Sequence, residues 1–154
     1  MDDLEPLVRM ERACFTHPWT PGQIEESLHS PARGRVLVLR SPRIAEPGRL
    51  VAYCIHRIVL DELDICTLAV AEPWRRCGLG RWLLDRVLEM AERRGVRSAF
   101  LEVRQSNWAA LELYRSVGFE IVGCRRGYYE TPREDAFLLR RVSPDGSAAG
   151  PNDS

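Results

Sequence analysis

The sequence predicts one mixed α/β (α+β) domain, because strand patterns and helix patterns alternate over a single-domain length of 154 residues. Residues 63–70 are mostly β-branched and apolar, and in residues 82–91 the apolar side chains recur at helical spacing. A loop that contains glycine joins these two elements. Glycines allow backbone N–H groups to approach an anion, and the N-terminus of a helix adds a partial positive charge. The succession therefore predicts a phosphate-binding loop.

Helices and hairpins are expected before this loop. Residues 4–15 have loosely helical apolar spacing. Thr20 is placed to cap a second helix, with Pro21 at its first position and Gln23 completing a capping box. Strands follow at residues 35–40, 50–60 and 63–70, so that two antiparallel hairpins lead into the loop.

The alternation continues after the loop. Ser106 and Asn107 are candidate caps for a further helix, and Gly118 ends it. The predicted elements are a strand at 99–104, a helix at 108–117, a strand at 119–126, a loop at 127–132 and a strand at 136–142. Residues 143–154 are small and polar, so we expect a domain at 1–142 and a flexible tail.

Composition excludes several classes of protein. The 22 basic and 22 acidic residues balance, so the charge indicates neither nucleic-acid binding nor a membrane surface. No apolar run is long enough for a transmembrane helix, and the acidic start lacks the apolar core of a secretion signal. The five scattered cysteines favour reduced packing thiols and a cytoplasmic location. Neither they nor the three histidines have ligand spacing, so we expect no metal.

The loop itself differs from two common nucleotide-binding motifs. A dinucleotide-binding loop would have glycine in place of Leu83, and a P-loop needs a Gly-Lys-Ser/Thr triplet that the chain lacks. The run R-R-C-G-L-G-R instead resembles the (Arg/Gln)-x-x-Gly-x-(Gly/Ala) acyl-CoA loop of the GNAT superfamily of N-acetyltransferases. Arg75, Gly78 and Gly80 match that motif.

Transfer of an acyl group from a thioester to an amine needs a base for the amine and a proton for the departing thiolate. Glu102 is a candidate base, because a carboxylate in the apolar strand 99–104 is costly unless it is paired or used. The structural alternative is an ion pair of Glu102 with an arginine such as Arg104 or Arg57.

Tyr114 is a candidate acid, because a phenol of reference pKa ~10 can protonate a thiolate whose thiol has a reference pKa of ~8.5. The alternative is a core tyrosine, since Tyr114 shares a helix face with Ala110 and Leu111. Asn107 also has two interpretations. It caps the helix, or its amide holds a carbonyl of a pantetheine arm.

Within the superfamily, the chain most resembles the ribosomal-protein-alanine N-acetyltransferase branch. The matching motifs are Leu101-Glu102-Val103-Arg104, Ser106-Asn107, Ala109-Ala110, Leu113-Tyr114, Gly118-Phe119 and Arg126-Gly127-Tyr128-Tyr129. The resemblance implies that Glu102 is the general base and Tyr114 the general acid. It implies acetyl-CoA contacts at Leu68, Ala69, Val70, Arg76, Cys77, Gly78, Leu79, Gly80, Arg81 and Asn107. Cys77 departs from the pattern, which commonly has arginine or lysine there.

The resemblance also implies the GNAT fold, a mixed, mostly antiparallel sheet flanked by helices, here with the first edge strand short or missing. The implied function is N-alpha-acetylation of a ribosomal small-subunit protein, with alanine as its first residue, by direct attack in a ternary complex with acetyl-CoA. Acidic residues at 61–64 and 130–135 have two interpretations. They form solvated turns, or they attract a basic N-terminal peptide, with Tyr128 and Tyr129 packing along its backbone. The alternatives are a GNAT enzyme that acts on lysine side chains or small amines, and a non-catalytic acyl-CoA-binding module. The oligomeric state stays open.

Overall fold

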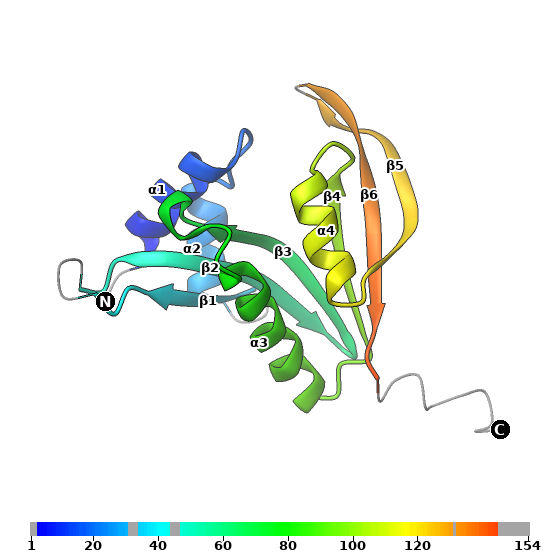
Figure 1. The fold of residues 1–154 in the computed structure, drawn as a ribbon, viewed down its shortest axis with the longest axis horizontal. Coiled ribbons are helices and arrows are strands. Elements are labelled where there is room, and N and C mark those ends of the chain that lie inside the picture. Colours follow the sequence, from blue (N-terminus) through cyan, green and yellow to red (C-terminus); the bar gives the residue numbers. More distant parts are fainter. Residues whose placement is uncertain (1–2, 31–33, 44–46, 131, 145–154) are drawn as a thin grey trace. The chain divides into compact units, whose positions relative to one another are not determined.

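The computed structural model describes residues 3–30, 34–43, 47–130 and 132–144 (Figure 1). The predicted order of helices and strands is confirmed, with one short 3-10 helix, η1, added after the third strand. The elements are α1 (Leu4–Cys14), α2 (Pro21–His29), β1 (Arg35–Arg40), β2 (Leu50–Val59), β3 (Glu62–Val70), η1 (Glu72–Trp74), α3 (Leu79–Arg93), β4 (Ser98–Arg104), α4 (Trp108–Ser116), β5 (Glu120–Glu130) and β6 (Arg133–Val142).

The six strands form one mixed sheet in the order β1-β2-β3-β4-β6-β5. β3 and β4 pair in parallel, whereas the β1–β2, β4–β6 and β5–β6 pairs are antiparallel. Among the described residues, the first strand of the chain follows α2, as expected for a short or missing edge strand. Most of the predicted tail, from residue 145 onward, lies outside the described residues.

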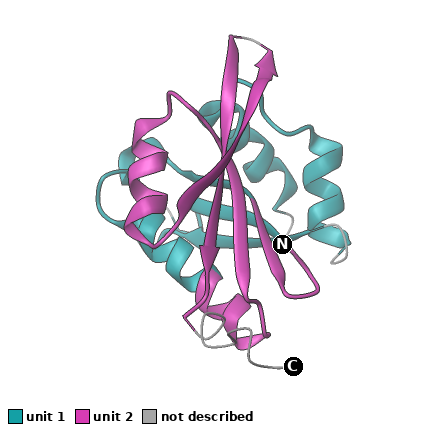
Figure 2. Ribbon diagram, turned by 90° about the vertical axis from the view of Figure 1, so that its right-hand side faces the viewer, with its two compact units in different colours: residues 1–57, 66–87 teal, residues 58–65, 88–154 magenta. Residues whose placement is uncertain are grey.

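The chain divides into two compact units, which Figure 2 colours separately. Unit 1 contains residues 1–57 and 66–87, and unit 2 contains residues 58–65 and 88–154. β3 and α3 each contribute residues to both units.

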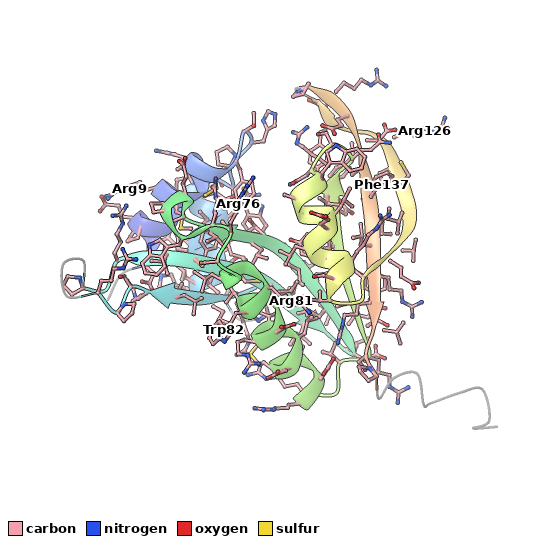
Figure 3. The ribbon with its side chains drawn as sticks, viewed as in Figure 1. Arg9, Arg76, Arg81, Trp82, Arg126 and Phe137 are labelled. Atoms are coloured by element: carbon pink, nitrogen blue, oxygen red, sulfur yellow. The ribbon has the colours of Figure 1, made fainter. Side chains whose placement is uncertain are left out.

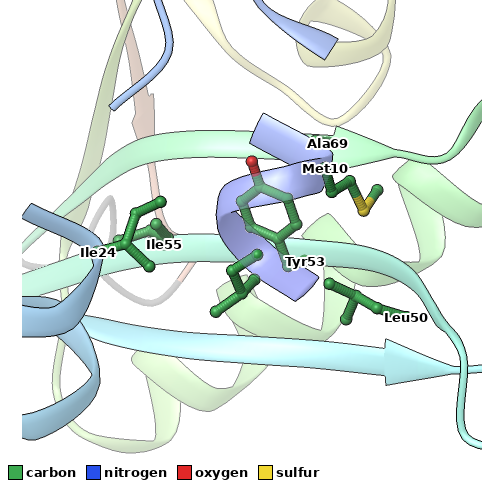
Figure 4. Close-up of a cluster of buried hydrophobic side chains, with 7 residues drawn as sticks. Met10, Ile24, Leu50, Tyr53, Ile55 and Ala69 are labelled. Carbon is green, nitrogen blue, oxygen red and sulfur yellow. The ribbon is translucent and has the colours of Figure 1, made fainter. Parts of the chain in front are cut away.

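The core of unit 1 packs α1 and α2 against β2 and the end of β3 (Figure 4). Its buried side chains are Leu7, Met10, Ile24, Leu50, Tyr53, Ile55 and Ala69. The predicted cap of α2 holds Ile24 in this core. Thr20 Oγ1 accepts a hydrogen bond from the Gln23 N–H at 3.3 Å, and Gln23 Oε1 accepts one from the Thr20 N–H at 2.9 Å. The reciprocal bonds satisfy two donors that the start of a helix would otherwise leave unpaired.

One carboxylate lies inside this core. Glu11, on α1, is only 1% exposed, and Tyr53, on β2, is fully buried. The Tyr53 hydroxyl donates a hydrogen bond to Glu11 Oε2, while the Trp19 N–H donates to Glu11 Oε1 at 3.0 Å. Burial, together with the bond to Glu11, raises the pKa of Tyr53 above its usual value. Glu11 thereby joins α1, β2 and the connection between the two helices.

Unit 2 is built on β4, whose side chains alternate between the two faces of the sheet. Ala99, Leu101 and Val103 are buried, whereas Phe100 and Glu102 are partly exposed. Helix α4 covers the face of Leu101 and Val103. Phe137, which pairs with Val103, lines a groove with Leu111 of α4. Arg141 Nε also donates to the Val117 carbonyl, at the end of α4, at 2.9 Å.

The predicted loop at 127–132 is wrong for residues 127–130, which belong to β5. β5 continues to Glu130 and β6 begins at Arg133, so the two form a long antiparallel pair. The pairing register shifts between Arg125 and Tyr129, which marks an irregularity of the β-bulge type. Gly127 lies in it with φ +61°, and its N–H donates to Asp135 Oδ1 at 2.7 Å. The glycine that suggested a loop therefore marks a bend within the hairpin.

The tip of this hairpin is fixed to the end of β4. Glu134 Oε1 accepts a hydrogen bond from the Ser106 N–H at 2.5 Å, and Glu134 Oε2 lies 3.4 Å from Arg104 Nη1. The Arg104 guanidinium lies over the Tyr129 ring, 3.9 Å from its centroid. The hydrogen bonds from the Ser106 side chain and backbone, with the nearby Arg104, lower the pKa of Glu134.

All five cysteines are free thiols, and Cys54 is fully buried. The expectation that the cysteines serve mainly in packing is wrong for Cys66, Cys77 and Cys124, which are exposed. Within the described part of the chain, no helix combines the length and the apolar character that crossing a membrane requires.

Tyr53→Phe should lower the free energy of unfolding by about 1–3 kcal/mol, because it leaves a buried carboxylate oxygen with one donor fewer. Urea denaturation at neutral pH measures this loss. The same change in a Glu11→Gln background should cost less, since a neutral amide replaces the charge. Equal costs in both backgrounds would contradict the coupling.

Glu134→Gln should lower the melting temperature at neutral pH and have no effect in strong acid. A carboxyl whose folded pKa is lowered stabilises the fold above its unfolded pKa of ~4.3, and this contribution disappears as the pH falls through the folded value. Thermal unfolding from about pH 7 to about pH 3 tests this, with Glu130→Gln on the same hairpin as the control. If the difference in melting temperature between the wild type and Glu134→Gln did not change with pH, the proposed contribution of the Glu134 carboxylate would be contradicted.

Candidate functional site

The predicted phosphate loop lies in unit 1, between η1 and α3. Arg76 has φ +60° and Gly78 has φ +81°, so two backbone units of this short turn adopt the left-handed conformation. Arg76, Cys77 and Gly78 are exposed. No atom lies within 4 Å of the position that a Cβ on Gly78 would occupy, so open space adjoins the loop there.

The start of α3 supplies hydrogen-bond donors. Trp82 makes the first helical hydrogen bond, to the Gly78 carbonyl at 3.0 Å. The N–H groups of Leu79, Gly80 and Arg81 precede this bond, and N–H groups at this position have no helical acceptor. The first turn contains no acidic residue. Figure 3 shows Arg76 on the loop and Arg81 on the first turn, and both side chains are exposed. The arrangement suits a bound anion.

Arg75, which matches the first position of the acyl-CoA motif, has a structural partner. Its Nε donates to the Val70 carbonyl at 2.8 Å, and its Nη2 lies 3.5 Å from Cys14 Sγ. The guanidinium therefore connects the loop to the end of β3 and to α1. Arg75 keeps its positive charge, since neither partner is an anion, and exposed Arg76 and Arg81 add to the positive charge at the loop.

The predicted cofactor strand, Leu68 to Val70, is the end of β3 in unit 1. The parallel ladder of β3 with β4 contains three pairs and ends at Asp64 and Phe100. Leu68, Ala69 and Val70 lie beyond that point on β3, as Leu101 to Arg104 do on β4. Backbone groups past the end of a ladder are open to another hydrogen-bonding partner, such as the amides of an extended ligand.

Glu102 has partners other than the predicted ones. Its Oε1 lies 3.2 Å from Arg125 Nη2, with the glutamate side chain 25% exposed and the arginine side chain 57% exposed. The alternative of an ion pair with an arginine is confirmed, although the partner is Arg125 and not Arg104, which pairs with Glu134. A hydrogen bond with Glu102, then burial, raises the pKa of Tyr128. The carboxylate is thus half-buried and contacts two side chains of β5.

The sequence argument missed Arg125 and the role of Tyr128. Both contacts depend on the register of β5 against β6 and of β6 against β4. Because residues 127–132 were expected to form a loop, Tyr128 was not placed on a strand. Its register against β6 could therefore not be predicted.

Tyr114 is buried on α4, and its ring meets that of Phe119 edge to face with centroids 5.7 Å apart. Because α4 covers the face of β4 that carries Leu101 and Val103, Tyr114 and Glu102 belong to opposite faces of the same strand. The structure therefore places the two candidate residues in unit 2 without bringing their side chains together.

Asn107 serves as the N-cap of α4, as predicted. Its Oδ1 accepts a hydrogen bond from the Ala110 N–H at 3.2 Å. The oxygen is thereby occupied, while the side-chain NH₂ keeps two donor hydrogens for another acceptor. The capping role and the carbonyl-binding role are compatible.

A groove of about 480 Å³ lies beside α4, and none of the predicted site residues lines it. Its lining includes Trp108, Leu111, Arg115, Ile121 and Phe137. The candidate groups lie instead on the loop and the end of β3 in unit 1, and on β4 and α4 in unit 2. Among the residues that the structure describes, no cluster of three or more His, Cys, Asp or Glu side chains is suited to hold a metal ion.

Comparisons with known proteins agree with this assignment. Residues 4–119 match the sequence model of the acetyltransferase (GNAT) family. The chain is 37% identical over 139 residues to the [ribosomal protein bS18]-alanine N-acetyltransferase of Escherichia coli, covering 89% of each chain. It is 40% identical over 151 residues to the N-alpha-acetyltransferase RimI of Mycobacterium tuberculosis, covering 94% of this chain and 90% of the relative.

A solved structure shows the same likeness. The crystal structure of the ribosomal-protein-S18-alanine N-acetyltransferase from Escherichia coli superimposes with a TM-score of 0.81 at 33% identity. The match covers 91% of this chain and 87% of the other. The chain therefore belongs to the acetyltransferase (GNAT) family, and it is an acetyl-CoA-dependent N-acetyltransferase.

Proposed function

We propose that this enzyme acetylates the N-terminal amine, with alanine as the first residue, of a ribosomal small-subunit protein in the cytoplasm. The observation that supports this most strongly is the likeness over about nine-tenths of the chain to the two relatives named for that type of reaction. We assign the domain to residues 1–142, with β6 as its last element.

The loop of unit 1 is suited to the pyrophosphate of acetyl-CoA. The backbone N–H groups at Leu79, Gly80 and Arg81 precede the first helical bond, and the space beside Gly78 is open. Exposed Arg76 and Arg81 add positive charge, and Cys77 contributes its backbone. Leu68, Ala69 and Val70 would offer backbone groups to the pantetheine amides, and the Asn107 NH₂ would donate to a carbonyl. When bound, acetyl-CoA supplies the acetyl thioester.

Glu102 is proposed to accept a proton from the acceptor amine, directly or through a water. An α-amine has a reference pKa of ~8, against ~10.4 for lysine, so one carboxylate is an adequate base near neutral pH. The half-buried Glu102 carboxylate is reachable from solvent, since its side chain is 25% exposed. These properties favour an α-amine over a lysine side chain as the acceptor.

Tyr114 is proposed to hold, on its Oη, the proton that the departing sulfur takes up. Packing of its ring against Phe119 holds the phenol in place. Glu102 and Tyr114 belong to opposite faces of β4, so the proposed base and acid occupy separate environments. The reaction is direct attack in a ternary complex, without an acetylated cysteine.

The acceptor is proposed to be a basic peptide. Exposed Asp61, Glu62 and Glu130 provide negative charge, whereas Glu134 is already bonded to Ser106 and Asp135 to Gly127. Tyr128 and Tyr129 meet edge to face with centroids 5.1 Å apart, and Tyr128 is 48% exposed. Their rings would pack along the peptide backbone.

A thiol-release assay with short peptides tests the acceptor. Alanine-initiated basic peptides should release CoA, whereas the same peptides with a blocked α-amine and an internal lysine should not. Release from the blocked peptides would favour the lysine or small-amine alternative. A burst of CoA release without acceptor would contradict direct attack.

Glu102→Gln and Tyr114→Phe should each lower kcat by about 10²–10⁴-fold, the usual contribution of a general acid or base. Calorimetric titration with CoA should give an unchanged affinity for both variants, because neither side chain belongs to the proposed pyrophosphate loop. Gln23→Ala, in the cap of α2, is a control for nonspecific loss of activity. Unchanged kcat in both variants, with CoA bound, would instead favour a non-catalytic binding module.

A further inference from the structure

Two side chains of β5 reach the carboxylate of Glu102 across an intervening strand. Ala136 of β6 is opposite Arg125 in one ladder and opposite Arg104 in the other. Residues opposite one another in antiparallel strands share a face, and Glu102 shares it with Arg104, two residues away. Ala136 is fully buried and has only a methyl side chain, so the long Arg125 side chain passes over it to Glu102.

This ion pair resembles the contact that an acceptor makes. A guanidinium and a protonated amine are both cations that donate N–H hydrogens to a carboxylate. The Arg125 side chain is 57% exposed, and ion pairs this exposed contribute little to stability. An incoming amine therefore displaces it at low cost.

Arg125 also has a second contact available. Its guanidinium carbon lies 5.6 Å from the centroid of the Tyr128 ring, within the range of a cation–π interaction. A guanidinium that leaves Glu102 keeps this aromatic partner on its own strand. The side chain therefore has a place to go without a change in the backbone.

We propose that Arg125 is a specificity-determining counter-ion that occupies Glu102 in the free enzyme and is displaced by the acceptor amine. This rests on the proposed role of Glu102 as the base. A cationic amine replaces one positive charge with another, whereas a blocked, neutral N-terminus would leave Glu102 without a counter-ion. After transfer the product amide is neutral. Once Glu102 has released the proton it accepted to solvent, Arg125 returns to the carboxylate, which favours release.

The test is calorimetric titration of an alanine-initiated peptide into the full chain with CoA, which carries no acetyl group to transfer. Arg125→Gln should tighten peptide binding about two- to fivefold, the range that an exposed ion pair supports, while CoA affinity stays unchanged. Arg125→Lys keeps the positive charge, so its peptide affinity should lie closer to that of the wild type. Arg126→Gln is the matched control, because Arg126 is the next residue of β5 and lies at the outer side of the hairpin (Figure 3).

A Glu102→Gln background separates this idea from the proposed function. There, Arg125→Gln should no longer change peptide affinity, because the partner charge is gone. Unchanged or weaker binding in Arg125→Gln, or an effect that persists in Glu102→Gln, would overturn the counter-ion. If Glu102→Gln alone keeps full kcat, the proposed base fails instead. A thermal melt of each variant confirms folding, and Arg125→Met replaces Arg125→Gln if that variant does not fold.

Discussion

The three-pair parallel ladder between β3 and β4 is the constraint on which the rest of the structure depends. It pairs Glu62, Leu63 and Asp64 with Ser98, Ala99 and Phe100, and then stops. Had the ladder continued, backbone N–H and C=O groups along both strands would hydrogen-bond to each other. Because it stops at Asp64 and Phe100, the β3 residues Leu68, Ala69 and Val70 have no β4 partner in that ladder.

The alternation of β4 then assigns the side chains. Leu101 and Val103 are buried beneath α4, so Glu102 between them must face the other way. Tyr114 belongs to the helix on the covered side, among apolar neighbours such as Phe119. One strand thereby separates a partly exposed carboxylate from a buried phenol. A base accepts a proton and an acid donates one, so these two environments suit the two roles proposed for Glu102 and Tyr114.

Much of the architecture followed from local sequence signals. The capping box at Thr20 and Gln23, the cap at Asn107 and the turn at Gly78 each depend on residues a few positions apart, which a sequence displays directly. Helix α3 begins at Leu79, earlier than the expected Trp82, because Leu79 and Gly80 already have helical geometry. Glu102 and Tyr114 were predicted as site residues, and their roles stay predictions.

The features that escaped the sequence depend on register between distant strands. The irregularity near Gly127 allows β5 to continue where a glycine suggested a break. This continuation keeps Tyr128 on the strand that reaches Glu102, whereas Arg125 lies within the predicted strand and depends only on the register of β5, β6 and β4. Likewise, Arg104 shares a face of β4 with Glu102 and was a reasonable partner in the sequence. In the structure it pairs instead with Glu134, on β6.

The surroundings of Gly78 have a consequence for chemical engineering of the loop. Its φ of +81° disfavours L side chains by about 1–2 kcal/mol, yet nothing within 4 Å would collide with a Cβ there. A D-amino acid prefers positive φ, so D-alanine introduced by semisynthesis would preserve the turn, whereas its mirror image would strain it. Within the protein itself, the constraint at this position is therefore backbone handedness and not steric space, and the open space is the one proposed for the pyrophosphate.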